Sequence, residues 1–157
     1  ATHAKGPILV YTTIVAGVGD LVEDKHVLDR AFEMARLNDA TLLLIAGFDP
    51  VTARDRARLT DAASEPRFSE THLSEEEAYD LVERARTLAV EHGVPLCQGV
   101  VVAGAAVSAL TFVAVEAQAD LVVVGSHGVD SLLGRLFGAV SIQVLRKSEC
   151  DVLVVVP

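Results

Sequence analysis

The feature that most constrains this fold is a set of five short runs rich in valine, leucine and isoleucine, spread along the whole chain. The runs are ILVYTT, TLLLIAGF, VPLCQGVVV, DLVVVG and DVLVVVP, at residues 8–13, 41–48, 94–102, 120–125 and 151–157. Their valine, leucine and isoleucine residues are mostly consecutive, which indicates strands that are buried on both faces. Such strands are typical of parallel sheets that lie between two layers of helices.

Helical patterns fill the stretches between these runs. Asp20 and Glu23 resemble a helix-opening capping pair, and they precede an apolar stripe at helical spacing that runs through Val27, Leu28, Ala31, Met34 and Ala35. Ser74 and Glu77 form the S-x-x-E capping box of a second helix, which Gly93 ends as a left-handed cap. An alanine-rich stretch over residues 106–118 and a short stretch over residues 139–147 predict two more helices.

The alternation of strands and helices predicts an α/β fold. We expect an open five-stranded parallel sheet with helices on both faces, a Rossmann-like architecture; two strand orders remain open at this point. Residues 1–157 are expected to form a single domain, with residues 1–6 as a frayed terminus and residues 49–73 as a variable loop. The polar part of that loop is interpreted either as a short helix around residues 53–59 or as a mobile excursion.

Charge and cysteine content limit the expected partners. The formal net charge of −9 argues against nucleic acid and anionic membrane, because both attract positive patches. Residues 94–115 carry no charge and are long enough to span a bilayer, but their proline, glycines and polar residues favour a strand followed by a buried helix. Cys97 and Cys150 lack metal-ligand spacing and, with no visible signal peptide, indicate a reducing cytoplasm.

The candidate binding site is the stretch GSHGVDSLLGRLFGAVS, residues 125–141, directly after a buried run. Glycines let backbone N–H groups approach phosphate oxygens, and the helix expected near Ala139 points its N-terminal amides at the same place. Ser126 and Ser141 can add hydroxyl donors. The alternative interpretation is that these glycines only permit a turn.

Charged side chains are few in this stretch, and none indicates catalysis. Arg135 is its one fixed cation, and His127 is more typical of a phosphate-side donor or a surface residue than of a base. The sequence has no G-x-x-x-x-G-K-[ST], G-x-S-x-G or H-E-x-x-H pattern, so we expect no catalytic residue, no metal site and no enzyme. If the first and fourth strands are central neighbours, a crevice lies between the loop after Thr13 and the loop after Val124.

The glycine spacing G-x2-G-x9-G at Gly125, Gly128 and Gly138, followed by a short helix and a terminal strand, resembles the universal stress protein family. The segment GAAVSALTFVAVEAQADLVVVGSHG is similar to that family's third helix and fourth strand, and GPILVYTT lies where its first strand begins. The resemblance extends over essentially the whole chain and is weakest over residues 49–71.

The resemblance implies a sheet of order 3-2-1-4-5, as in the adenine nucleotide α-hydrolase-like folds, and homodimers paired through the last strand, Val152–Val156. It implies ATP binding in members with the glycine motif, with the phosphates on residues 125–141 and the adenosine near Ala46 and Gly47. Thr13 takes the position of the family's usual Asp, and Ala139 that of a Ser or Thr. The nucleotide-binding candidates are Thr12, Thr13, Gly47, Gly125, Ser126, His127, Gly128, Arg135, Gly138, Ala139, Val140 and Ser141.

Three functions are therefore weighed. The first is a regulatory module that binds ATP, with or without Mg²⁺, and acts as a homodimer in the stress response; a cyclic nucleotide is compatible with it. The second is a dimeric interaction protein of the same fold that has lost nucleotide binding, which Thr13 and Ala139 favour. The third, a hydrolase, lacks an acid/base pair or an activated nucleophile. The implied strand order also puts Cys97 and Cys150 roughly 19 Å apart, which is too far for a disulfide within one subunit.

Overall fold

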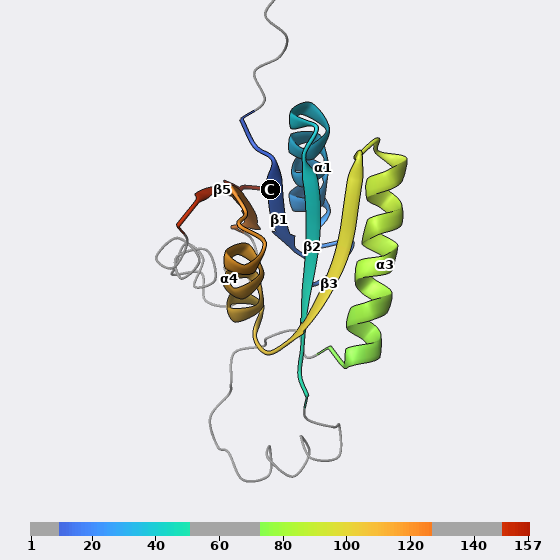
Figure 1. Cartoon of the computed structure of the whole chain (residues 1–157). Helices are drawn as coiled ribbons and strands as arrows, with labels where there is room; N and C mark the ends of the chain where they lie inside the picture. Colours follow the sequence, from blue (N-terminus) through green and yellow to red (C-terminus); the bar gives the residue numbers. More distant parts are fainter. Residues whose placement is uncertain (1–9, 51–72, 127–148) are drawn as a thin grey trace, which may run out of the picture.

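The fold is built on one parallel sheet. The computed structural model describes residues 10–50, 73–126 and 149–157. The strands β1 to β5 pair in parallel in the order β3-β2-β1-β4-β5, which confirms the predicted sheet and its order. Their bounds are Thr13–Gly17, Thr41–Phe48, Leu96–Ala103, Leu121–Gly125 and Asp151–Val155. The described helices are α1 (Lys25–Asn38), α3 (Glu75–Glu91) and α4 (Ala106–Glu116), as Figure 1 shows.

Helices cover both faces of this sheet, as predicted. On β2, Leu42 and Leu44 join a buried cluster with α1 and α3, whereas Leu43 and Ile45 join a second cluster with α4. The same alternation occurs on β1 and β4, so the unbroken apolar runs reflect burial on two sides. The edge strand β3 is the exception, because Leu96 is 52% exposed and several of its neighbours are also exposed.

The predicted helix ends are largely confirmed. The Ser74 side chain accepts a hydrogen bond from the Glu77 N–H at 3.2 Å, and the Glu77 carboxylate accepts one from the Ser74 N–H at 2.7 Å. Gly93 has φ of +79°, the left-handed conformation expected of its cap. Asp20 does cap the backbone of Glu23 at 2.9 Å, but α1 itself begins only at Lys25 because a turn comes between them.

The first strand is present, but its predicted bounds are wrong. The apolar run predicts a strand at residues 8–13, whereas β1 runs from Thr13 to Gly17. The carboxylate of Asp120 accepts hydrogen bonds from the Thr12 N–H at 2.8 Å, the Thr12 hydroxyl at 3.0 Å and the Thr13 N–H at 3.0 Å. These bonds tie the chain to the start of β4 just before β1 begins. The residues that follow Thr13, which were expected to leave the sheet as a loop, instead form the strand.

The remaining expectations about the chain have mixed outcomes. Residues 94–115 contain β3 and most of α4, as predicted. Over the described part of the chain, every helix falls short of what crossing a membrane would need in length and apolarity. Cys97 on β3 and Cys150 before β5 are free thiols at opposite edges of the sheet. The predicted helices at residues 53–59 and 139–147, and most of the predicted loop at 49–73, lie outside the described residues.

Burial raises the pKa of the Cys97 thiol to about 11, far more than the opposing effect of Arg86. We predict that iodoacetamide alkylates Cys97 on the order of tenfold more slowly than free cysteine at pH 8, because its thiolate fraction is so small. Mass spectrometry of a time course measures the rate. A rate equal to that of free cysteine in the native protein would contradict this environment, and addition of urea should restore that rate as the positive control.

Burial favours the neutral form of Asp120, but the hydrogen bonds from Thr12 and Thr13 outweigh it and lower the pKa of its carboxyl. We predict that Asp120→Asn lowers the free energy of unfolding by about 2 kcal/mol at pH 7. A lowered folded-state pKa stabilises the fold above the unfolded value of about 3.9, and this stabilisation is lost as pH falls through the folded pKa.

Urea denaturation of both proteins at pH 7 and pH 3 therefore tests this assignment. The difference between Asp120→Asn and the parent should shrink at the lower pH. Asp29→Asn is the matched control, because Asp29 forms an exposed ion pair with Lys25 and its loss should cost less than about 1 kcal/mol. Equal effects of the two substitutions at pH 7 would show that Asp120 does not hold the start of β1.

Candidate functional site

At the carboxyl edge of the sheet, three strands end at or next to a glycine, so few side chains lie there. β1 ends at Gly17, β2 carries Gly47 as its penultimate residue, and β4 ends at Gly125. The strand order reverses between β1 and β4, which is where open parallel sheets form a ligand crevice beyond their carboxyl ends. The candidate site therefore lies between the loop after Gly17 and the chain leaving β4 at Ser126.

The structure divides the predicted site residues into three groups. Gly47, Gly125 and Ser126 lie at this carboxyl edge. Thr12 and Thr13 lie at the amino edge, one strand length away, so the expectation that Thr13 lies at the end of the first strand is wrong. Four residue steps of about 3.3 Å separate Thr13 from Gly17. The other predicted residues lie outside the described residues, and they are His127, Gly128, Arg135, Gly138, Ala139, Val140 and Ser141.

The loop that follows β1 takes the place that Thr13 was expected to occupy. Val18 comes next after the strand, and its N–H donates to the Ile45 carbonyl at 2.8 Å. Its side chain is buried in the cluster with α1 and α3. The end of β1 therefore brings no charged side chain into the crevice. The family's usual Asp was expected to be replaced by Thr13. In the structure the residue that follows the end of β1 is Val18, which also carries no charge.

Two carboxylates hold the backbone of this loop. The N–H groups of Gly19 and Asp20 both donate to Asp24 Oδ2, at 2.7 and 2.9 Å. Asp20 Oδ1 accepts from the N–H groups of Glu23 and Val22, and these bonds lower the pKa of Asp20. Backbone amides at this edge can thus hold an anionic oxygen, which fits the predicted chemistry. Here a carboxylate of the chain, that of Asp24, already takes that position, so these two amides are not free for a second anion.

The end of β2 packs closely against the entrance to α4. A Cβ at Gly47 would lie 2.5 Å from the Gly104 carbonyl oxygen, a distance that side chains do not tolerate. Gly104 itself has φ of +123°, and Ala105 caps α4 without a side-chain hydrogen bond. Ala46, the other predicted neighbour of adenosine, is fully buried on the opposite face. Close packing therefore gives one sufficient reason for glycine at position 47.

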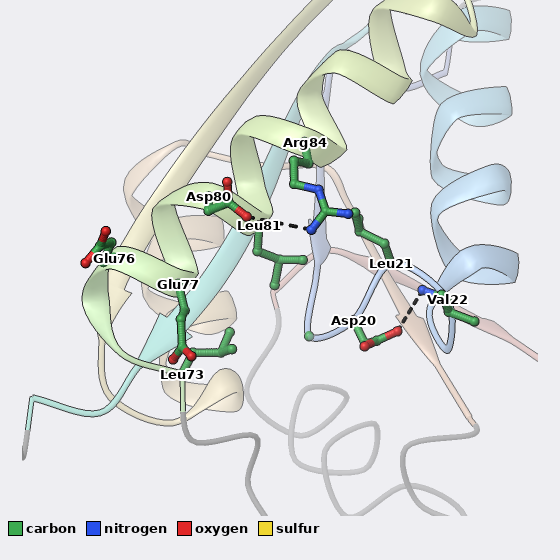
Figure 2. A pocket seen from close by; sticks show the side chains of 10 residues that line it. Asp20, Leu21, Val22, Leu73, Glu76, Glu77, Asp80, Leu81 and Arg84 are labelled. Carbon is green, nitrogen blue, oxygen red and sulfur yellow. Dashed lines mark hydrogen bonds and ion pairs between the residues drawn. The ribbon is translucent and has the colours of Figure 1, made fainter. Parts of the chain in front are cut away.

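A separate hollow of about 530 Å³ lies between the loop after β1 and the N-terminal half of α3 (Figure 2). Leu21, Leu73 and Leu81 give it an apolar part. Its charged residues are Asp20, Glu76, Glu77, Asp80 and Arg84. Arg84 approaches Asp80 at 3.7 Å, as the dashed line shows, so the hollow keeps an acidic excess that disfavours a triphosphate. Within the described ranges, no three side chains are grouped as a metal site.

Two aspartates that bind backbone N–H groups at opposite edges of the sheet were not predicted from the sequence. Asp120 and Asp24 each accept hydrogen bonds from two successive backbone N–H groups. Asp120 stands directly before a buried apolar run, and Asp24 directly before a helix. These positions were the only signals available, and neither identifies the backbone groups that the carboxylate binds.

Comparison with known proteins identifies the family. The model of the universal stress protein family matches residues 10–156. The chain belongs to the universal stress protein family. Universal stress protein Rv1636 of Mycobacterium tuberculosis is 31% identical over 145 residues, which cover 92% of this chain and 96% of that protein.

Solved structures of universal stress proteins share this fold. A universal stress protein crystallised in complex with cAMP is 30% identical, has a TM-score of 0.69, and is matched over 92% of this chain and 97% of its own. UspA from Lactobacillus plantarum is 19% identical with a TM-score of 0.71, over 92% of this chain and 97% of its own. At that identity the second match supports the fold alone.

We predict that Gly47→Ala destabilises this universal stress protein by about 1–3 kcal/mol, because the new methyl group must displace the Gly104 backbone. Urea denaturation gives the change in free energy. Gly17→Ala is the matched control at the neighbouring strand end, since its Cβ would meet the flexible end of Leu110 at 3.1 Å. A cost for Gly47→Ala no larger than that of the control would show that the end of β2 is loosely packed.

Proposed function

We propose that this universal stress protein binds an adenine nucleotide at its carboxyl edge and acts as a homodimeric regulatory module in the stress response, without catalysis. The observation that carries the proposal is its similarity to a universal stress protein crystallised with cAMP, at 30% identity over 92% of this chain. Candidate ligands are ATP, with or without Mg²⁺, and a cyclic nucleotide.

The described part of the edge supports this proposal by its chemistry. The chain carries a formal net charge of −9, so the overall field does not attract an anion. An anion must then be held by local donors, and the main-chain amides of Gly19 and Asp20 show that this edge can hold a carboxylate oxygen in that way. The stretch that starts at Gly125 supplies further glycine amides in sequence, and it leaves the sheet at the same edge. We assign the phosphate to these amides and to the hydroxyl of Ser141.

The exposed edge strand β5 supports the proposal of a homodimer. β5 is the outermost strand beside β4, and Val156 directly after it is 67% exposed. A second copy pairing with Val152–Val156 would cover this edge and its apolar residues. The two free cysteines are consistent with the cytoplasmic location that we propose for the dimer.

The alternative is a dimeric interaction protein without a nucleotide, and one observation favours it. The end of β1 presents Val18 rather than an acid, and the next two amides are taken by Asp24. A loss of one charge-assisted hydrogen bond costs about 1.5–3 kcal/mol, or on the order of tenfold to a hundredfold in affinity. The phosphate side of the site would then be kept while the nucleoside side is weakened.

Thermal denaturation with ATP, ATP plus Mg²⁺, or cAMP tests the proposal. A ligand at a hundredfold excess over its Kd adds about 2.7 kcal/mol, which raises the Tm by roughly 5–10 °C in a chain of this size. We predict such a rise, and its loss in Gly128→Val and Gly138→Val.

Thr13→Ala is the control, because the structure puts Thr13 at the amino edge; it should keep the full rise. Circular dichroism of the unliganded variants shows whether they fold. No rise with any of the three ligands at millimolar concentration would favour the nucleotide-free dimer. Loss of the rise in Thr13→Ala would contradict the placement of the nucleotide at the carboxyl edge.

A further inference from the structure

The edge of the sheet opposite β5 is an open strand without charge. β3 pairs with β2 along all eight of its residues, and no other described strand pairs with it. Its sequence, LCQGVVVA, contains no charged residue. Edge strands that stay unpaired usually carry lysine, proline or a bulge that prevents association; here only Pro95 precedes the strand. Such an edge fits another extended, uncharged strand.

One side of α3 borders this open edge. α3 packs over β3 and β2, whereas α1 covers the other half of the same face (Figure 1). Leu81 and Arg84 of α3 face the loop before α1, so the opposite side of the helix lies beyond β3. That side carries Tyr79, Glu83, Arg86 and Val90 at helical spacing. Tyr79 is 54% exposed and Val90 is 59% exposed.

We propose that two copies of this protein associate through β3, antiparallel and about a two-fold axis near Gln98. Val82 packs against Gly99, and α3 runs against the direction of β3 because it connects two parallel strands. The middle of the α3 stripe, between Glu83 and Arg86, is therefore about level with Gln98. The axis then brings each Glu83 toward Arg86 of the partner subunit, and each Tyr79 toward Val90 of the partner subunit. The stripe is therefore complementary to itself in both charge and apolarity.

The spacing of the elements agrees with this pairing. Paired strands lie about 4.8 Å apart, so the two-fold axis lies half that distance outside β3. A helix that lies above the line between β2 and β3 is half a spacing further in, so it is about one strand spacing from the axis. The two α3 helices would then lie roughly 10 Å apart and antiparallel, which is an ordinary distance for packed helices. The pairing thus satisfies the backbone groups of β3 and covers exposed apolar side chains in one step.

A second copy fits this surface better than a charged partner does. β3 itself offers no charge to complement, and the flanking Glu83 and Arg86 carry opposite charges, so the stripe has no net charge that would select a charged partner. Because β5 lies at the far edge, association through β3 is independent of the dimer proposed through β5. Both contacts together would join copies into an open row, whose length depends on protein concentration.

Disulfide trapping tests the register. In a background of Cys97→Ser and Cys150→Ser, Gln98→Cys puts two cysteines opposite each other on the axis, with their Cα atoms about 4.5–5.5 Å apart. Val100→Cys is the matched control on the same strand, because two such residues would be about 14 Å apart. Mild oxidation should convert most Gln98→Cys protein to a covalent dimer and leave Val100→Cys reduced. Equal trapping of both, trapping of Val100→Cys alone, or trapping of neither overturns the proposal.

Charge reversal in the parent chain provides a second measurement that needs no cysteine. Glu83→Arg and Arg86→Glu should each weaken association on the order of tenfold, because like charges then face each other across the axis. The double exchange restores complementarity and should restore association. Arg84→Glu, on the other side of α3, should leave it unchanged. Sedimentation velocity over a range of concentrations measures each constant, and a double exchange as weak as the single variants contradicts the pairing.

Discussion

The carboxylate of Asp120 holds the chain where the central strand β1 begins. The start of β1 determines which residues lie at the carboxyl edge of the sheet. Because Asp120 binds the amides of Thr12 and Thr13, β1 starts at Thr13 and ends four residues later at Gly17. The pairing of β1 with β2 and β4 then brings Gly17 level with Ile45 and leaves Gly125 at the same edge. A different start for β1 would change which residues reach the crevice.

The sequence predicted strands well where burial on both faces left no alternative. The predicted strand TLLLIAGF has the same first and last residues as β2. Its central residues, Leu42 to Ala46, are all buried beneath helices. The start of β1 was missed because residues 8–11 are as apolar as the strand, while the hydrogen bonds that decide its position come from Asp120, over a hundred residues away. The exposure of β3 does not follow from its residues, since a run of valines does not reveal whether the strand lies at an edge; only the strand order implied by the family resemblance placed it there.

The candidate site was predictable only in part. The glycines at the carboxyl edge follow from the general geometry of parallel sheets, and Gly47 and Gly125 lie where that geometry requires them. The role of Asp24 was not predictable, because no local pattern shows that its carboxylate binds the two amides of the preceding turn. The misplacement of Thr13 followed directly from the error in β1. An incorrect strand boundary of a few residues is enough to move a side chain to the other edge of a sheet.

The glycine-ended strands have a consequence for how the proposed binding at this edge would respond to acidity. Peptide amides do not gain or lose protons between about pH 4 and 9, whereas histidine and carboxyl groups do. An anion held mainly by such amides would respond to its own ionisation rather than to that of the protein. A crevice of this kind keeps its donor strength through changes of cellular acidity that would disable one built from histidines.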